Sequence, residues 1–242
     1  MSAATHVRCE ILRTVRNPRT LGITLGLPLV LFFAVAGANR HAHVDGISFP
    51  LYFMGAMAAY GAMFAAVQPG ARIALDRSTG WTRQLRITPL RARTYFASKV
   101  LTAYLVALTS LVALFLAGTT FGVHMAAARW LEIGGLLLIG LAPLVVIGVA
   151  LGHLLAPDSL TPAIAGVVVL FALFGGAFGP LFKTGAMLSV VKLLPSYWLV
   201  QASRVADGGG GWPAEAWVVI AVWTAATVGL ASVAYRRDTG RV

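Results

Sequence analysis

The chain has 242 residues, of which 58% are hydrophobic and 11% are charged, and its mean hydropathy is +0.81. Soluble domains carry about 25% charged residues, so this composition argues against a soluble domain and predicts a protein embedded in lipid. The formal net charge of +11 comes from basic residues in short loops between apolar stretches. That distribution is typical of membrane topology and of contact with anionic lipid, and it argues against nucleic-acid binding.

Residues 1–19 predict an amphipathic helix that lies in the cytoplasmic membrane interface. Val7, Ile11 and Val15 fall on one helical face, the arginines lie largely on the other faces, and the pattern ends at Asn17-Pro18. Such a helix suits the interface ahead of a first span, and the alternative is a frayed, positively charged leader. The segment has no apolar core, so no cleavable signal peptide is expected.

Six stretches of the chain are long and apolar enough to span a membrane. A bilayer core of about 30 Å requires about 20 apolar residues in a helix, and only Glu132 interrupts these stretches with a charge. We therefore predict an all-α integral membrane protein, with a six-helix transmembrane domain at residues 20–235 and a cytoplasmic tail at 236–242. The predicted spans are Thr20–Ala38, Phe49–Val67, Val100–Phe121, Leu131–Leu155, Thr161–Phe182 and Ala216–Tyr235.

The basic residues predict the orientation of these spans. Fourteen of the nineteen lie in the N-terminal segment, in the loop between the second and third spans, and in the tail. Because Lys and Arg are enriched in cytoplasmic loops, both termini are expected in the cytoplasm. On the outer side, residues 183–213 are too long for a tight turn, and short helices are expected there at Ala186–Leu194 and Tyr197–Val205.

The loop after the second span, residues 76–90, contains the most informative motif. Gly80 and Pro89 bracket a short helix at about residues 77–90, which Thr88-Pro89 would end. A charged helix beneath the membrane is available for docking by another protein. The same residues also suit a solvated cytoplasmic loop, and physical grounds alone favour neither interpretation.

Two aromatic stripes are candidates for a substrate path. One in the second span has 4-3-4 spacing and one in the fifth has 3-4-4 spacing, so each falls on one helical face. Aromatic and Met surfaces adapt to apolar ligands, but ordinary packing against helices or lipid explains the stripes at least as well. Their members are Phe53, Met57, Tyr60 and Phe64, and then Phe171, Phe174, Phe178 and Phe182.

No catalytic or metal site is predicted in this chain. Gly176–Thr184 ends in Lys-Thr after glycines, but a phosphate loop needs Gly directly before the Lys, and Phe182 holds that position. His41 and His43 could bind metal by proximity, although surface histidines are usually solvated. Secondary transporters usually place ionisable residues inside their spans, and the predicted spans contain no charged residue except Glu132, at the start of the fourth.

In this order and spacing, three motifs resemble those of the ABC-2 type exporter permeases. The family's loop pattern is an acidic residue, then Gly, then Leu-x-x-Thr-Pro, and Asp76, Gly80, Leu85, Thr88 and Pro89 match it. Arg83 departs from the pattern, because the family usually has an acidic residue at that position. Pro195, Tyr197 and Arg204 are similar to the family's Asn-Pro-x-x-Tyr...Arg element, with Leu194 in place of the Asn. The third match is Arg16-Asn17-Pro18-Arg19-Thr20. The coupling residues that follow from the resemblance are Asp76, Gly80, Arg83, Leu85, Arg86, Thr88 and Pro89.

The resemblance implies the membrane subunit of an exporter in a bacterial cell membrane. Such subunits work as homodimers or heterodimers of membrane halves, and the loop helix rests on a separate ATPase, which holds the ATP and Mg²⁺. This chain would then need no cofactor and catalyse no reaction, and it would export a hydrophobic or amphipathic drug, antibiotic or lipid. The alternative is a membrane protein without an ATPase, such as a secondary carrier, a scaffold or an immunity protein.

Overall fold

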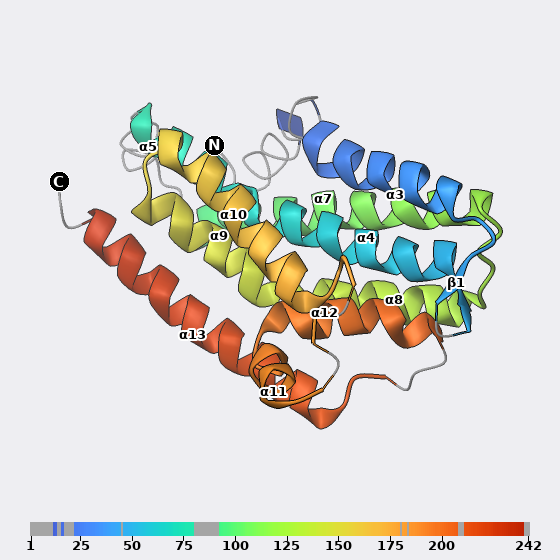
Figure 1. The fold of residues 1–242 in the computed structure, drawn as a ribbon. Helices are drawn as coiled ribbons and strands as arrows, with labels where there is room; N and C mark the ends of the chain where they lie inside the picture. Colours follow the sequence, from blue (N-terminus) through green and yellow to red (C-terminus); the bar gives the residue numbers. More distant parts are fainter. Residues whose placement is uncertain are drawn as a thin grey trace.

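The computed structural model shows an elongated bundle of helices with one small β-hairpin (Figure 1). It describes residues 12–13, 16, 22–44, 46–79, 92–179, 181–182, 184–207 and 211–239. The elements in this part of the chain are η1 (Gly22–Gly26), α3 (Leu27–Ala38), β1 (His43–Val44), β2 (Ile47–Ser48), α4 (Phe49–Val67), α5 (Pro69–Ser78), α7 (Ala92–Thr120), α8 (Ala127–Gly140), α9 (Ala142–Leu154), α10 (Pro157–Gly175), α11 (Ala186–Lys192), α12 (Pro195–Ser203), η2 (Arg204–Asp207) and α13 (Ala214–Thr239).

The predicted class, an all-α membrane protein, agrees with these helices. By length and composition, five helices in the described part could cross a membrane: Phe49–Ser78, Thr94–Thr120, Ala127–Leu154, Pro157–Gly175 and Ala214–Ala234. The first predicted span corresponds to the shorter apolar helix Thr24–Ala38. A sixth crossing therefore remains a prediction.

The helix α5 was not predicted, and it shortens the expected loop. Pro69 interrupts the ladder after α4 but suits the first turn of a new helix, so the helical path continues to Ser78. Arg72 and Arg77, which were expected in the loop, therefore belong to this helix. The fourth predicted span is also divided, because α8 ends at Gly140 and α9 begins next to Pro143.

The fifth predicted span, Thr161–Phe182, extends beyond the end of its helix. The helix α10 begins at Pro157, and it ends at Gly175 because Gly176 adopts a left-handed conformation with φ 82°, the usual way for glycine to end a helix. Phe178 and Phe182 consequently lie in the loop that follows. Of the four residues predicted to share one helical face with 3-4-4 spacing, only Phe171 and Phe174 therefore lie in the helix.

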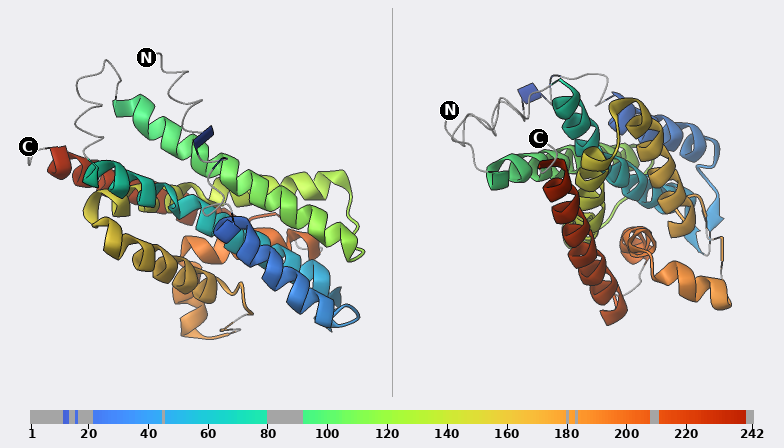
Figure 2. Two further views of the ribbon diagram at one scale, coloured as in Figure 1. Left: turned by 90° about the horizontal axis from the view of Figure 1, so that it is seen from above. Right: turned by 90° about the vertical axis from the view of Figure 1, so that its left-hand side faces the viewer.

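The helix α4 lies at the centre of the bundle, where it packs against α3, α7, α9, α10 and α12. In the most apolar window of Phe49–Ser78, 78% is buried within the chain, against 28% for α10 and 17% for α13. Small residues permit this burial: a Cβ on Gly55 would lie 2.9 Å from Ser203 Cβ, and one on Gly61 would lie 2.7 Å from Ser110 Oγ. The helices α10 and α13 lie at the outside of the bundle (Figure 2), and their exposed apolar side chains suit contact with lipid.

Two short helices, α11 and α12, occur close to the predicted positions in residues 183–213. Indole groups fix them, since Trp198 Nε1 donates a hydrogen bond to Lys192 O at 2.7 Å and Trp212 Nε1 donates one to Trp198 O at 3.0 Å. The antiparallel hairpin β1–β2 pairs His43 with Ser48, and it was not predicted. It lies at the opposite end of the bundle from the end of α5 (Figure 1).

Candidate functional site

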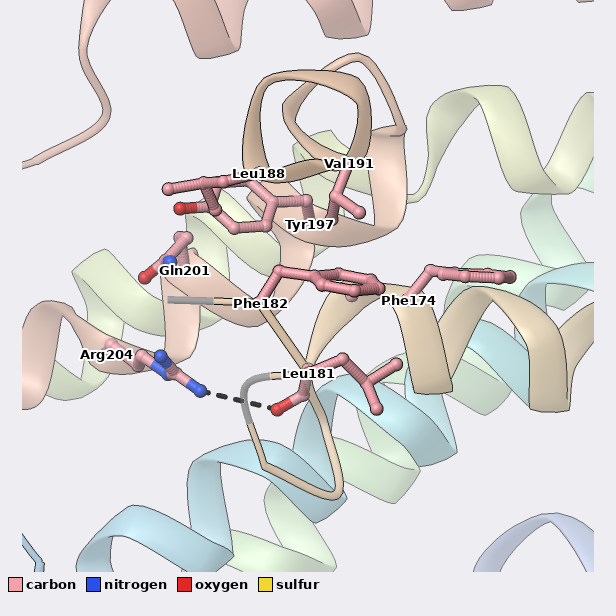
Figure 3. Close-up of a pocket in the computed structure, with 10 residues that line it drawn as sticks. Phe174, Leu181, Phe182, Leu188, Val191, Tyr197, Gln201 and Arg204 are labelled. Carbon is pink, nitrogen blue, oxygen red and sulfur yellow. Dashed lines mark hydrogen bonds between the residues drawn. The ribbon is translucent and has the colours of Figure 1, made fainter. Parts of the chain in front are cut away.

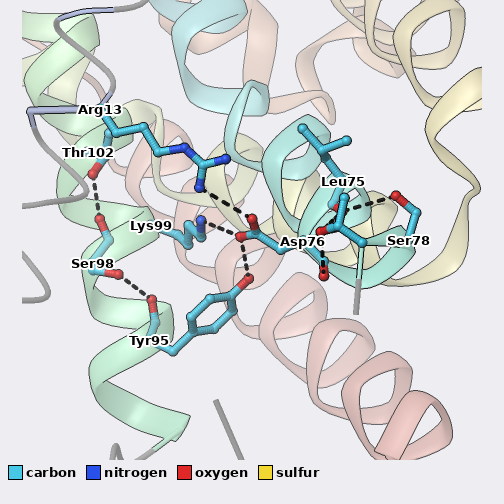
Figure 4. A network of polar contacts seen from close by, with 9 residues as sticks. Arg13, Leu75, Asp76, Ser78, Tyr95, Ser98, Lys99 and Thr102 are labelled. Atoms are coloured by element: carbon cyan, nitrogen blue, oxygen red, sulfur yellow. Dashed lines mark hydrogen bonds and ion pairs between the residues drawn. The ribbon is translucent and has the colours of Figure 1, made fainter. Parts of the chain in front are cut away.

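The first candidate site is the end of α5, directly before the segment that carries the predicted docking motif. Asp76 lies in the last turn of this helix, and its carboxylate points toward α7 (Figure 4). Asp76 Oδ2 lies 2.9 Å from Lys99 Nζ and accepts a hydrogen bond from the Tyr95 hydroxyl at 3.3 Å. On the other side, Arg13 Nη1 lies 3.5 Å from Asp76 Oδ1.

The Asp76–Lys99 ion pair is buried. The Lys99 side chain is 1% exposed and that of Asp76 is 4% exposed, whereas Arg13 is 55% exposed. Removing two charges from water is costly, so such a pair persists where hydrogen bonds and opposite charge compensate both groups. Its carboxylate is thus unavailable for direct contact with another protein, and Asp76 instead fixes α5 against α7.

A second contact joins α5 to α9. Arg77 Nη1 donates to Gly152 O at 3.1 Å and to Leu155 O at 3.4 Å, carbonyls at the end of α9 that its helix leaves without partners. The backbones also touch here: a Cβ on Gly70 would collide with Gly148 O, and one on Gly152 would lie 2.6 Å from Gly70 O. Glycine at positions 70, 148 and 152 thus permits the close packing of α5 against α9.

The predicted docking segment therefore has two fixed ends. It leaves α5 after Thr79, which follows the Asp76 anchor, and the chain returns in α7, where Tyr95 and Lys99 hold the other side of the same network. A force applied to this segment would therefore be transmitted to α5, α7 and α9 together. Most of the predicted coupling residues lie outside the described residues, namely Gly80, Arg83, Leu85, Arg86, Thr88 and Pro89.

The aromatic stripe of α4 is mainly packing within the chain. Met57 is fully buried and Tyr60 is 5% exposed, both in the main core, while Phe53 and Phe64 are half-buried. The stripe meets the second one where the rings of Tyr60 and Phe178 lie 5.6 Å apart. Within the described part of the chain, Met57 and Tyr60 thus contribute to the main core.

The second candidate site is a cavity of about 270 Å³ between the end of α10 and the helices α11 and α12, here called the α11–α12 pocket (Figure 3). Of the second stripe, Phe174 and Phe182 line it. So do Tyr197 and Arg204 of the predicted outer motif, and Pro195 of that motif begins α12. Arg204 Nη2 donates to the Tyr52 hydroxyl at 3.2 Å and to Gly176 O at 3.3 Å.

The network around Lys99 was missed because Lys99 was assigned to the loop. It lies within α7 and is buried, so the helices contain ionisable residues that the predicted spans did not. The sequence did contain a signal for this ion pair, since Asp76 is the only acidic residue between Asp45 and Glu132. Any internal ion pair of Lys99 within that stretch had to involve it.

Comparison with known proteins gives two matches. Residues 43–234 match the model of a protein family described as "ABC-2 family transporter protein". A Bacillus subtilis (strain 168) protein named "Putative transport permease YvfS" is 22% identical over 191 residues, which is 78% of this chain and 78% of that protein. The family match includes the Asp76–Lys99 pair and every residue of the α11–α12 pocket.

Proposed function

The chain belongs to the ABC-2 family of transporter proteins, and on this premise we propose that it is the membrane subunit of an ATP-driven exporter. The ATP and Mg²⁺ would be bound by a separate ATPase subunit. Two membrane subunits, identical or different, would form the transport path between them. The cargo would be a hydrophobic or amphipathic compound, and the complex would lie in a bacterial cell membrane.

The observation that carries this proposal is the double anchorage of residues 80–91. A docking segment can transmit force only if it is fixed to the elements that must move, and here the buried Asp76–Lys99 pair joins its two flanking helices. The Arg77 contacts extend the connection to α9. Closure of the ATPases would push this segment, and α5, α7 and α9 would tilt as one unit.

A carrier that uses a proton gradient is the second candidate. The observation in its favour is the buried Asp76–Lys99 pair, because ionisable residues within membrane helices often form proton paths. The pair lies in the last turn of α5 rather than deep within a span, and Arg13 and Tyr95 compensate the carboxylate further. These contacts suit a structural anchor between α5 and α7.

The orientation is tested by labelling single cysteines in a Cys9→Ser background. Ser78, His43 and Met187 are exposed and therefore suitable positions. We expect an impermeant thiol reagent to label His43→Cys and Met187→Cys in intact cells, and Ser78→Cys only after lysis. Labelling of Ser78→Cys in intact cells would contradict the proposed cytoplasmic position of α5.

Docking is tested at Leu85, the apolar residue of the loop motif. We expect Leu85→Asp to abolish co-purification with an ATPase encoded by an adjacent gene, because a charge would replace the apolar contact. Leu85→Met is the matched control and should retain the complex. Equal recovery of the ATPase with Leu85→Asp, at equal membrane expression, would refute the docking role.

A further inference from the structure

Arg204 stands at the α11–α12 pocket with an unbalanced charge. A guanidinium has five N–H donors, and among the described residues the acceptors of Arg204 are the neutral Tyr52 hydroxyl and Gly176 carbonyl, both at Nη2, with the Tyr52 ring 5.3 Å from the guanidinium carbon. The side chain is half-buried, and none of the ion pairs between described side chains includes it. Nε and Nη1 remain available to an additional acceptor, and an anion would also compensate the charge.

The surrounding sequence increases the preference for an anion. Residues 159–206 contain three basic residues, Lys183, Lys192 and Arg204, and no acidic residue, and Asp158 and Asp207 directly flank this stretch. They include most of α10, the whole of α11 and α12, and all the lining of the α11–α12 pocket. A local excess of positive charge attracts anions.

The pocket is polar at one end and apolar at the other. Figure 3 shows Gln201 and Arg204 together on one side, and Phe174, Phe182 and Val191 on the opposite side. The volume of about 270 Å³ lies just below the range of about 300–1,000 Å³ for small-molecule sites. It therefore suits a headgroup with the first part of a chain, whose remainder would lie in lipid.

We propose that the α11–α12 pocket binds an amphipathic anion, with its carboxylate or phosphate on Arg204 and its apolar chain against Phe174 and Phe182. The planar guanidinium fork favours these oxyanions because it can bind them through two hydrogen bonds. The assignment rests on the proposed function in one respect: such an anion would be cargo that leaves, or lipid that enters, at the outer half of an exporter.

Binding to the purified chain in discs of phosphatidylcholine tests this proposal without an ATPase. Calorimetry would compare dodecyl phosphate, dodecyltrimethylammonium and inorganic phosphate as probes. We expect only dodecyl phosphate to bind strongly. Arg204→Gln should weaken its binding about tenfold or more, since a hydrogen bond to a charged group contributes at least that factor. Arg40→Gln, at an exposed arginine outside the pocket, is the matched control and should change nothing.

A second variant keeps the test valid if Arg204→Gln fails to fold. Gln201→Glu retains the Arg204 contacts to Tyr52 and Gly176 and places a carboxylate in the pocket. We expect the thermal unfolding temperature to stay level or rise while binding of dodecyl phosphate falls at least tenfold, because the internal carboxylate competes for the same guanidinium.

Discs that contain phosphatidylglycerol distinguish the two sources of the anion. If this lipid competes with dodecyl phosphate, the occupant is a membrane lipid; if it does not, the occupant is a soluble amphipath, and either result supports the proposal. Equal binding of the cationic probe, or unchanged affinity in both pocket variants, would overturn it. Such a failure would leave the exporter role standing, whereas normal binding without ATP-driven transport would count against the proposed function alone.

Discussion

Replacing Lys99 with methionine is expected to destabilise the protein by about 3–5 kcal/mol, the usual cost of removing one partner of a buried ion pair. The substitution keeps a long apolar side chain in α7, so packing changes little. It leaves the Asp76 carboxylate buried, and its remaining partners among the described residues are the Tyr95 hydroxyl and the more distant, largely exposed Arg13. Unfolding of the purified protein in detergent, by heat or by increasing concentrations of dodecyl sulfate, measures the decrease in stability.

The double variant Lys99→Met/Asp76→Asn separates charge from packing. The amide introduced by Asp76→Asn would still accept a hydrogen bond from Tyr95 but carries no charge, and replacing a buried pair by neutral groups is often close to neutral. We expect the double variant to recover more than half of the stability lost in Lys99→Met. An effect of Lys99→Met below about 1 kcal/mol, the range of surface pairs, would contradict the anchoring role.

Substituting Gly70 with alanine is also expected to destabilise the protein strongly. The added Cβ would collide with the Gly148 carbonyl, and because the opposing atom is backbone, no side chain can rotate away. Overpacking of this kind costs about 1–3 kcal/mol and occasionally more. We expect a lower unfolding temperature and, in the full complex, weaker stimulation of the ATPase, because α5 and α9 would no longer move together.

Gly166→Ala is the matched control for Gly70→Ala. Gly166 also lies within an apolar helix, α10, but a Cβ there would meet no atom within 4 Å. The substitution should leave the unfolding temperature level or slightly higher, since alanine favours helix. A similar decrease of the unfolding temperature in both variants would show that the close approach of α5 to α9 makes no particular contribution to stability.

The sequence predicted those features that depend on local composition. Apolar stretches of sufficient length indicated the helices, and Pro195 marked the start of α12 within a residue or two of its predicted position. The helix α5 was missed because its residues, Pro69–Ser78, are amphipathic and too polar to resemble a span. The early end of α10 depends on the conformation of Gly176, and a glycine in an apolar stretch does not reveal whether it turns the chain.

The candidate sites were less predictable because they depend on contacts between distant residues. The outer motif, Pro195, Tyr197 and Arg204, was visible as a pattern, but its role at a pocket follows only from the approach of Gly176 and Tyr52. The aromatic spacing of α4 was the same whether Met57 and Tyr60 faced a path or the core. The burial of Met57 and Tyr60 depends on the helices that pack around α4, and the sequence of α4 alone does not show which of its faces those helices cover.

Transport into inside-out membrane vesicles tests the central claim most directly. The vesicles would contain this chain with or without a co-expressed ATPase from an adjacent gene, and a panel of fluorescent amphipathic dyes would report accumulation. The proposed function predicts accumulation that requires both ATP and the ATPase, persists when an uncoupler removes the proton gradient, and disappears in Leu85→Asp. Accumulation by the chain alone, or its loss on addition of the uncoupler while ATP is present, would contradict that function and favour a proton-driven carrier.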